Sequence, residues 1–166
     1  MIGGMRFRGI FPVSLKPTML SVLILPLVLL SGCASTPQAT RERDAEAKEF
    51  VTHPATAAIY VYRSPLDQPG ADTVLYVDHR LIGSTLPGGF FRVDANPGKR
   101  RLHGIAHDQG VLEIEVRPGE IYFVALTVLD GTSRYVARPA AIGRAELLDC
   151  CVLLENWAPG QRPLLR

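Results

Sequence analysis

The sequence predicts a mainly β protein, a single antiparallel β-sandwich domain of about seven to eight strands with a short C-terminal helix. Between residues 55 and 156, short apolar runs are separated by Gly, Pro and Asp, which is the spacing of strands and tight turns. Residues 111–117 alternate apolar and charged side chains, the period of a strand with one wet face. The length fits one domain.

The other strands are predicted from runs of β-branched and aromatic residues, which favour a pleated surface. The predicted strands are 59–62, 74–77, 90–94, 101–106, 111–117, 121–129 and 135–138. The turn at residues 96–98 (Asn-Pro-Gly) predicts a hairpin between 90–94 and 101–106, and Gly119 is expected at positive φ in a type II turn. Residues 121–129 are apolar almost without a break, which predicts a central strand covered on both faces.

Within 111–117 the core face is predicted to be Leu112, Ile114 and Val116, and the solvent face to be Glu113, Glu115 and Arg117. Residues 140–154 carry helix formers, with Ile142, Leu147, Cys151 and Leu154 at helix-compatible spacing, so we expect one short helix there. The tail 157–166 contains two prolines and a glycine and is expected to be irregular.

The N-terminus has the parts of a secretory signal: Arg6, Arg8 and Lys16, then the apolar run 19–30, then two small residues. A membrane-spanning helix needs about 20 apolar residues. This run is interrupted by Pro26 and turns polar at Ser31, so a cleaved signal peptide over 1–32 is favoured over a span. The motif Leu30-Ser31-Gly32-Cys33 resembles the lipobox of bacterial lipoproteins.

This resemblance implies that Cys33 becomes the first residue of the mature chain and carries a diacylglycerol and an acyl chain. Each buried CH₂ contributes about 0.8 kcal/mol, and two chains suffice for stable anchoring. Residues 34 and 35 are Ala and Ser rather than the Asp that retains lipoproteins at the inner membrane. The expected location is the cell envelope, at the outer membrane facing the periplasm.

The net charge of the mature chain limits the classes of partner that the sequence predicts. Removing residues 1–32 removes three of the 18 basic residues and none of the 16 acids, so the mature chain has a formal charge of −1. The charge gives no case for nucleic acid as a partner. Residues 34–54 are small, polar and charged without an apolar stripe, which predicts a flexible tether behind the lipidated cysteine, with Phe50 and Val51 able to dock on the domain's edge.

Two cysteines remain besides Cys33, and they are the neighbours Cys150 and Cys151. On a helix their side chains would diverge by about 100°, which disfavours a mutual disulfide. We therefore expect two largely buried thiols, with a disulfide between the neighbours or an intermolecular bond as alternatives. There is no Cys-x-x-Cys spacing or nearby His to predict a redox or metal role.

No catalytic, cofactor-binding or metal-binding residue is predicted. His103 and His107 are four residues apart, which on a strand separates them by about 13 Å, too far to share a zinc ion. The serines lie in turn contexts without a nucleophile-elbow pattern, and Glu113 and Glu115 are explained by the solvent face of their strand.

Two clusters could contact a partner. Lys99, Arg100 and Arg101 form the densest basic group, suited to an anionic headgroup or polymer unless it is a solvated hairpin entry. Tyr60, Tyr62 and Tyr76 would form a partner-binding or glycan-binding face, or else close the second face of the sandwich.

Several segments together resemble the bacterial lipoprotein family known as domain of unknown function 2846: residues 47–50, 58–63, 77–78, 82–83, 97–98 and 119–124. The resemblance implies a prealbumin-like or carboxypeptidase-regulatory-like β-sandwich and no established activity. After Val77 this chain has Asp78-His79 where related modules have Asp-Gly, so His79 is expected in the left-handed conformation.

The resulting hypothesis is a membrane-anchored, non-enzymatic lipoprotein whose domain binds or positions an envelope protein or a cell-wall glycan. The alternative is a periplasmic hydrolase or thiol-redox protein that uses surface acids or Cys150 and Cys151.

Overall fold

The computed structural model describes residues 36–67, 73–105 and 110–156, so the predicted signal peptide, Cys33 and the tail 157–166 lie outside the described residues. The elements in chain order are α2 (Arg41–Ala47), β1 (Ala57–Arg63), β2 (Thr73–Val77), β3 (Arg80–Thr85), β4 (Gly89–Ala95), β5 (Gly98–His103), β6 (Val111–Val116), β7 (Ile121–Leu129), β8 (Thr132–Arg138), α3 (Ala140–Cys150) and β9 (Val152–Leu153).

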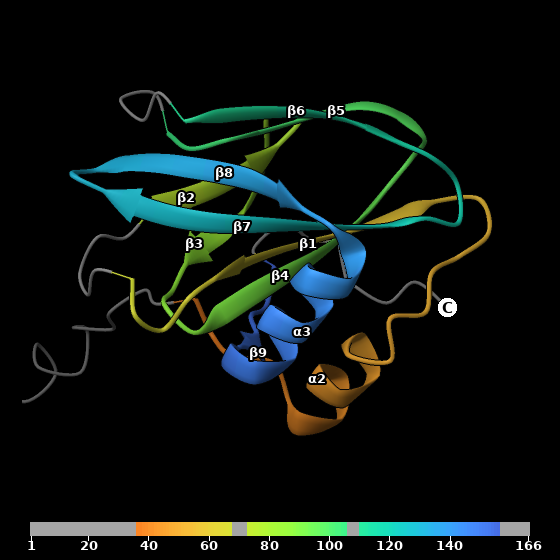
Figure 1. Ribbon diagram of the computed structural model, residues 1–166, viewed down its shortest axis with the longest axis horizontal. Helices are drawn as coiled ribbons and strands as arrows, with labels where there is room; N and C mark the ends of the chain where they lie inside the picture. Colours follow the sequence, from red (N-terminus) through yellow and green to blue (C-terminus); the bar gives the residue numbers. More distant parts are fainter. Residues whose placement is uncertain (1–35, 68–72, 106–109, 157–166) are drawn as a thin grey trace, which may run out of the picture. The chain divides into compact units, whose positions relative to one another are not determined.

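The strands form two sheets, which confirms the predicted β-sandwich with its short C-terminal helix (Figure 1). The five-stranded sheet has the order β8-β7-β1-β4-β9 and the four-stranded sheet the order β3-β2-β5-β6. The pairings β1–β7 and β4–β9 are parallel, and the other strand pairs are antiparallel. The sandwich is therefore mixed rather than purely antiparallel.

Strand β1 lies between β7 and β4 in the five-stranded sheet, and all seven of its residues are buried. Ile59 and Val61 belong to the core between the two sheets, whereas Tyr60 and Tyr62 belong to a second core on the outer face. This alternation is the two-residue period of a strand. One strand thus supplies side chains to both cores.

Helices α2 and α3 contribute to the second core on the outer face of the five-stranded sheet (Figure 1). Helix α3 approaches β7 so closely that a Cβ at Gly143 would lie 2.3 Å from the Cβ of Phe123. The guanidinium of Arg144 lies 4.4 Å from the centre of the Phe50 ring, and Phe50 also contacts Tyr60. Glycine at position 143 is what allows this contact between helix and sheet.

The segment predicted to be a tether is folded from residue 36 onward, which corrects that prediction. Gln38 forms an antiparallel bridge with Leu154, beside the two-residue strand β9. Helix α2 follows, and Ala47 at its end is fully buried while Phe50 is 7 % exposed. Phe50 docks as expected, but Val51 remains 56 % exposed.

Polar contacts fix this segment where an apolar stripe is lacking. The Asp44 carboxylate accepts a hydrogen bond from the Leu153 amide at 2.8 Å, and Arg43 forms an ion pair with Glu155. The Tyr60 hydroxyl donates to the carbonyl of Ala47 at 2.7 Å. Helix α2 is held mainly through backbone and charged groups. Hydrophobic periodicity in the sequence therefore cannot predict that it docks on the sheet.

The predicted hairpin between 90–94 and 101–106 is wrong. Strand β4 pairs with β1 and β9, whereas β5 pairs with β2 and β6 in the other sheet. The turn at Pro97 and Gly98, where Gly98 has φ +116°, carries the chain from one sheet to the other. The local turn signal was correct, but a turn does not specify which strands pair.

The C-terminal helix ends four residues earlier than expected. Cys151 is in an extended conformation (φ −129°, ψ 147°), and Val152 and Leu153 pair with β4 as strand β9.

Strand β3 was also not predicted. It follows a turn in which Asp78 and His79 both have positive φ, so the expectation for His79 is confirmed, as is that for Gly119.

A substitution at Phe50 tests whether the N-terminal segment is part of the fold. We expect Phe50→Ala to lower the free energy of unfolding by about 3–5 kcal/mol, since it removes a buried aromatic ring. Val51→Ala, at the exposed neighbouring position, should change it by less than about 0.5 kcal/mol. Chemical denaturation of the full-length chain measures both. Equal, small effects would restore the tether interpretation.

Candidate functional site

A cleft of about 350 Å³ lies where α3 leaves the outer face of the five-stranded sheet uncovered. Its lining comes from the end of β1, the turn after it, β7, β8 and α3. The residues are Tyr62, Ser64, Pro65, Leu66, Ala125, Leu126, Thr127, Arg138, Glu146, Asp149 and Cys150. An apolar surface with a few polar groups at this volume is typical of a ligand pocket.

Strand β7 explains why the cleft is there. Phe123 is buried beneath α3, but Thr127 and Leu129, further along the same face, are exposed. The expectation that this strand is covered on both faces therefore holds for its first half only. The cleft occupies the boundary between the covered and the open part of the sheet.

The turn that forms one wall of the cleft is held by a buried ion pair. The Arg63 guanidinium contacts the Asp67 carboxylate at 3.0 Å, and their side chains are 1 % and 8 % exposed. Arg63 also donates to the carbonyl of Thr85, and Asp67 accepts from the amide of Val128 at 3.0 Å. These contacts fix the position of Ser64, Pro65 and Leu66.

The opposite wall carries a linked polar group of three side chains. The Tyr62 hydroxyl donates to Glu146, which also forms an ion pair with Arg138 at 2.9 Å. Burial, and then the hydrogen bond to Glu146, raise the pKa of Tyr62. The same hydrogen bond is the main factor that lowers the pKa of Glu146, so the pair keeps a neutral phenol and an ionised carboxylate.

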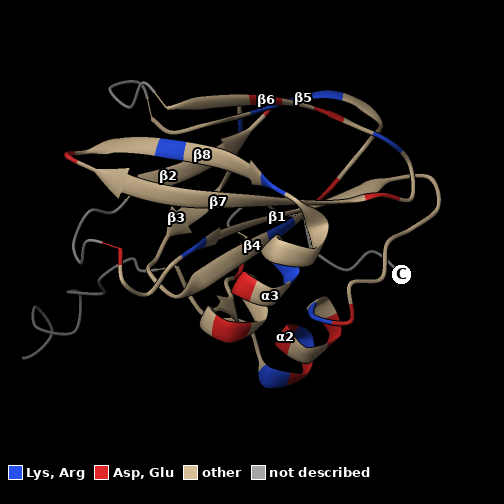
Figure 2. Cartoon of the chain, viewed as in Figure 1, with Lys and Arg blue, Asp and Glu red and all other residues tan. Residues whose placement is uncertain are grey.

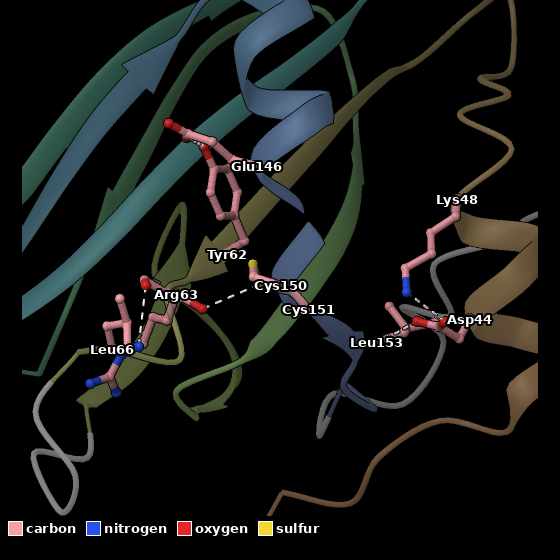
Figure 3. The surroundings of a disulfide bond; sticks show 10 residues. Asp44, Lys48, Tyr62, Arg63, Leu66, Glu146, Cys150, Cys151 and Leu153 are labelled. Atoms are coloured by element: carbon pink, nitrogen blue, oxygen red, sulfur yellow. Dashed lines mark hydrogen bonds and ion pairs between the residues drawn. A yellow bond between two sulfur atoms is a disulfide. The ribbon is translucent and has the colours of Figure 1, made fainter. Parts of the chain in front are cut away.

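Cys150 and Cys151 form a disulfide between neighbours, which corrects the expectation of two buried thiols (Figure 3). Divergence by about 100° holds only for two neighbours on a helix, but α3 ends at Cys150 and Cys151 is extended. Cys150 is partly exposed in the cleft wall, whereas Cys151 is 3 % exposed and belongs to the second core. The two sulfur atoms therefore have different surroundings.

The predicted tyrosine face does not exist. Tyr60 is fully buried and Tyr62 is 4 % exposed, both on the outer face of the five-stranded sheet. Tyr76 lies in β2 of the other sheet, where its ring stacks on His103 with centres 5.1 Å apart. Tyr60 and Tyr62 close the second face of the sandwich, as the alternative proposed, and Tyr62 alone reaches the cleft.

The basic cluster lies on β5 beside acidic residues. Arg100 forms an ion pair with Asp78 at 2.6 Å. Lys99 stands opposite Glu115 on β6, and Arg101 opposite Glu113. Both signs of charge therefore lie side by side on these two strands, as Figure 2 shows, and the cluster is not a concentrated positive patch.

The histidines do not form a metal site within residues 36–67, 73–105 and 110–156. No group of three or more His, Cys, Asp or Glu side chains is placed to hold a metal ion in that part of the chain. His103 lies near His79, with ring centres 5.3 Å apart, and His107 is outside the described residues. Among the described helices, none is long and apolar enough to cross a membrane.

The cleft was not predicted from the sequence. It depends on where α3 stops and on how the turn at 64–67 folds back on β7. Two signals were available, the polar Thr127 within an otherwise apolar run and the Glu146 and Asp149 carboxylates near the cysteine pair. Neither identifies a cleft without the pairing of β1 with β7.

The fold and the cleft define the chain as a two-sheet β-sandwich domain with helices over part of one sheet face. No family model and no solved structure matches it. It is similar to an uncharacterized protein of Haemophilus influenzae, 28 % identical over 99 residues. The match covers 58 % of this chain and 59 % of the relative, so this chain spans less than two thirds of that protein's length.

The polar group at the cleft gives a pH-dependent prediction. Because folding lowers the pKa of Glu146, this carboxylate stabilises the fold above its unfolded pKa of about 4.3, and the stabilisation is lost as pH falls through the lower folded pKa. We expect Glu146→Gln to be less stable than the natural chain at neutral pH and the difference to shrink in acid.

Denaturant unfolding at a series of pH values measures this difference. Glu113→Gln is the matched control for the loss of one carboxylate, since Glu113 is exposed on β6. A difference between Glu146→Gln and the natural chain that stays constant through the acid range would contradict the assigned role of Glu146.

Proposed function

We propose that this protein is a membrane-anchored envelope lipoprotein whose β-sandwich binds or positions a protein partner or cell-wall component without catalysing a reaction. The lipobox-like motif ending at Cys33 supports the anchor. The cleft beside α3 carries the binding function, because it is concave, partly apolar and equipped with few polar groups. The resemblance to domain of unknown function 2846 agrees with this proposal and adds no activity to it.

The folded N-terminal segment sharpens the consequence of anchoring. Only residues 34 and 35 separate Cys33 from Thr36, whose side chain accepts a hydrogen bond from the Ser84 amide at 3.0 Å. A residue spans at most about 3.6 Å, so three steps reach about 11 Å. An acylated Cys33 would hold this domain close to the membrane surface, without a long flexible spacer.

The cleft favours a particular kind of occupant. Leu66 is 94 % exposed at its edge, and Pro65 and Ala125 add further apolar surface. At about 350 Å³ the cleft is large enough for one sugar unit or a few side chains of a partner. A protruding segment of a protein or glycan fits this cleft better than a flat surface does.

Catalysis has less support from the same geometry. Glu146 is engaged by Tyr62 and Arg138, so it is not a free general acid or base. Asp149 is exposed, and the other carboxylate among the cleft-lining residues is Glu146, which is already engaged. A hydrolytic pair would need two carboxyl groups available on either side of the reacting bond.

Lipid attachment is tested at Cys33. We expect the natural chain, expressed in a bacterium with lipoprotein processing, to incorporate radiolabelled palmitate and to sediment with membranes. Cys33→Ser should lose the label and leave the membrane fraction, because the acyl chains provide the anchor. Cys151→Ser, which keeps the motif intact, is the control for loss of a cysteine. Equal labelling of natural chain and Cys33→Ser would refute the anchor.

Occupancy of the cleft is tested by filling it. Thr127 lies exposed in the cleft lining on a β-strand, so Thr127→Trp should block the cleft while keeping a residue type that suits a strand. We expect affinity capture from envelopes with the detergent-solubilised natural chain to recover a reproducible protein or glycan, and Thr127→Trp to lose it.

Thr132→Trp, exposed on β8 and outside the cleft lining, is the matched control and should retain the partner. Thermal unfolding of both variants confirms that they fold. Absence of any reproducible partner, or undiminished capture by Thr127→Trp, would count against the proposed binding site.

A further inference from the structure

We propose that Cys150 and Cys151 form a thiol–disulfide exchange site that opens into the cleft, with Cys150 as the sulfur attacked and Cys151 as the sulfur released. The reductant is a dithiol without net negative charge. This goes beyond binding, since it assigns a reversible covalent reaction to the cleft wall.

Unequal access to the two sulfur atoms is the first observation behind this assignment. Cys150 ends α3, is partly exposed and lines the cleft, whereas Cys151 is 3 % exposed and packed in the second core. An incoming thiolate must reach the sulfur it attacks in line with the bond that breaks. Of the two cysteines, Cys150 is the one that lines the cleft, so a thiolate entering the cleft meets Cys150 first.

The second observation is a hydrogen-bond acceptor placed beside the sulfur that would be released. The Sγ of Cys151 lies 3.2 Å from the carbonyl oxygen of Arg63 (Figure 3). A disulfide sulfur carries no proton, so this contact becomes a hydrogen bond only when Cys151 is a thiol. The carbonyl therefore offers the reduced form an acceptor at a position that is buried from water.

Reduction of the Cys150–Cys151 disulfide takes two exchange steps. A thiolate of the dithiol attacks Cys150, forming a mixed disulfide, and the electron pair of the broken sulfur–sulfur bond passes to Cys151. Cys151 takes up the proton that the attacking thiol lost and donates it toward the Arg63 carbonyl. The second thiol of the reductant then attacks the mixed disulfide, which releases Cys150 as a thiol and leaves the reductant as a disulfide.

The charge around the cleft selects the reductant. The lining carries two carboxylates, Glu146 and Asp149, against one cation, Arg138, which is already paired with Glu146. The C-terminal end of α3 adds partial negative charge beside Cys150. This field repels an anionic thiol such as glutathione and favours a neutral or cationic one.

The test uses the full-length chain in detergent and single-cysteine variants of the pair. With the neutral probe 4,4′-dithiodipyridine, folded Cys151→Ser should react at Cys150 at least about tenfold faster than folded Cys150→Ser reacts at Cys151. In denaturant the two rates should converge. Peptide mapping by mass spectrometry separates these adducts from any adduct at Cys33.

The natural chain supplies a second measurement that does not depend on the folding of a variant. Treated with excess cysteamine and quenched with acid, it should carry the mixed disulfide on Cys150. At equal thiolate concentration, cysteamine should also reduce the pair faster than glutathione does. Asp149→Asn should lower the ratio of the cysteamine rate to the glutathione rate.

Equal reactivity of the two variants in the folded state, or an adduct predominantly on Cys151, would overturn the proposal. None of these readouts involves the lipid anchor or a captured partner. A failure here is therefore distinguishable from a failure of the proposed binding function.

Discussion

The buried ion pair between Arg63 and Asp67 is the interaction on which the functional end of this domain depends. Its Arg belongs to β1, which is the strand that contributes to both cores. Removing one partner from such a pair costs about 3–5 kcal/mol, since it leaves a buried charge uncompensated. The intact pair adds little net stability, because the cost of removing two charges from water offsets their attraction. What the pair provides is one specified position for the turn after β1.

Arg63 also connects the cleft to the disulfide through its backbone. Its carbonyl oxygen accepts a hydrogen bond from the Gly88 amide at 3.1 Å and lies beside the Cys151 sulfur. The Arg63 guanidinium positions one wall of the cleft. The carbonyl of the same residue contacts the cysteine pair at the opposite wall. A shift of β1 by one residue would exchange its two faces and dismantle both arrangements.

The sequence predicted features that depend on the residue pattern within one strand. The alternation in β6 places Val116 in the core and exposes Glu113 and Glu115, as predicted. Prediction failed where the outcome depends on a neighbour. The apolar run of β7 does not reveal that α3 stops short of its second half, and the alternating tyrosines of β1 do not reveal which face helices will cover. The disulfide was missed for the same reason, because the pairing of Val152 and Leu153 with β4 is what ends the helix.

The N-terminal segment links these local facts to the proposed mode of action. Ala39 donates to the carbonyl of Leu153 at 2.8 Å, and Leu153 follows the cysteine pair by two residues. Described residues from 36 onward thus share hydrogen bonds with the strand that leaves α3, and no flexible spacer separates the start of the fold from the cleft. A tethered domain searches a volume set by its linker. A domain anchored at Cys33 in this way would instead meet partners within reach of the membrane surface.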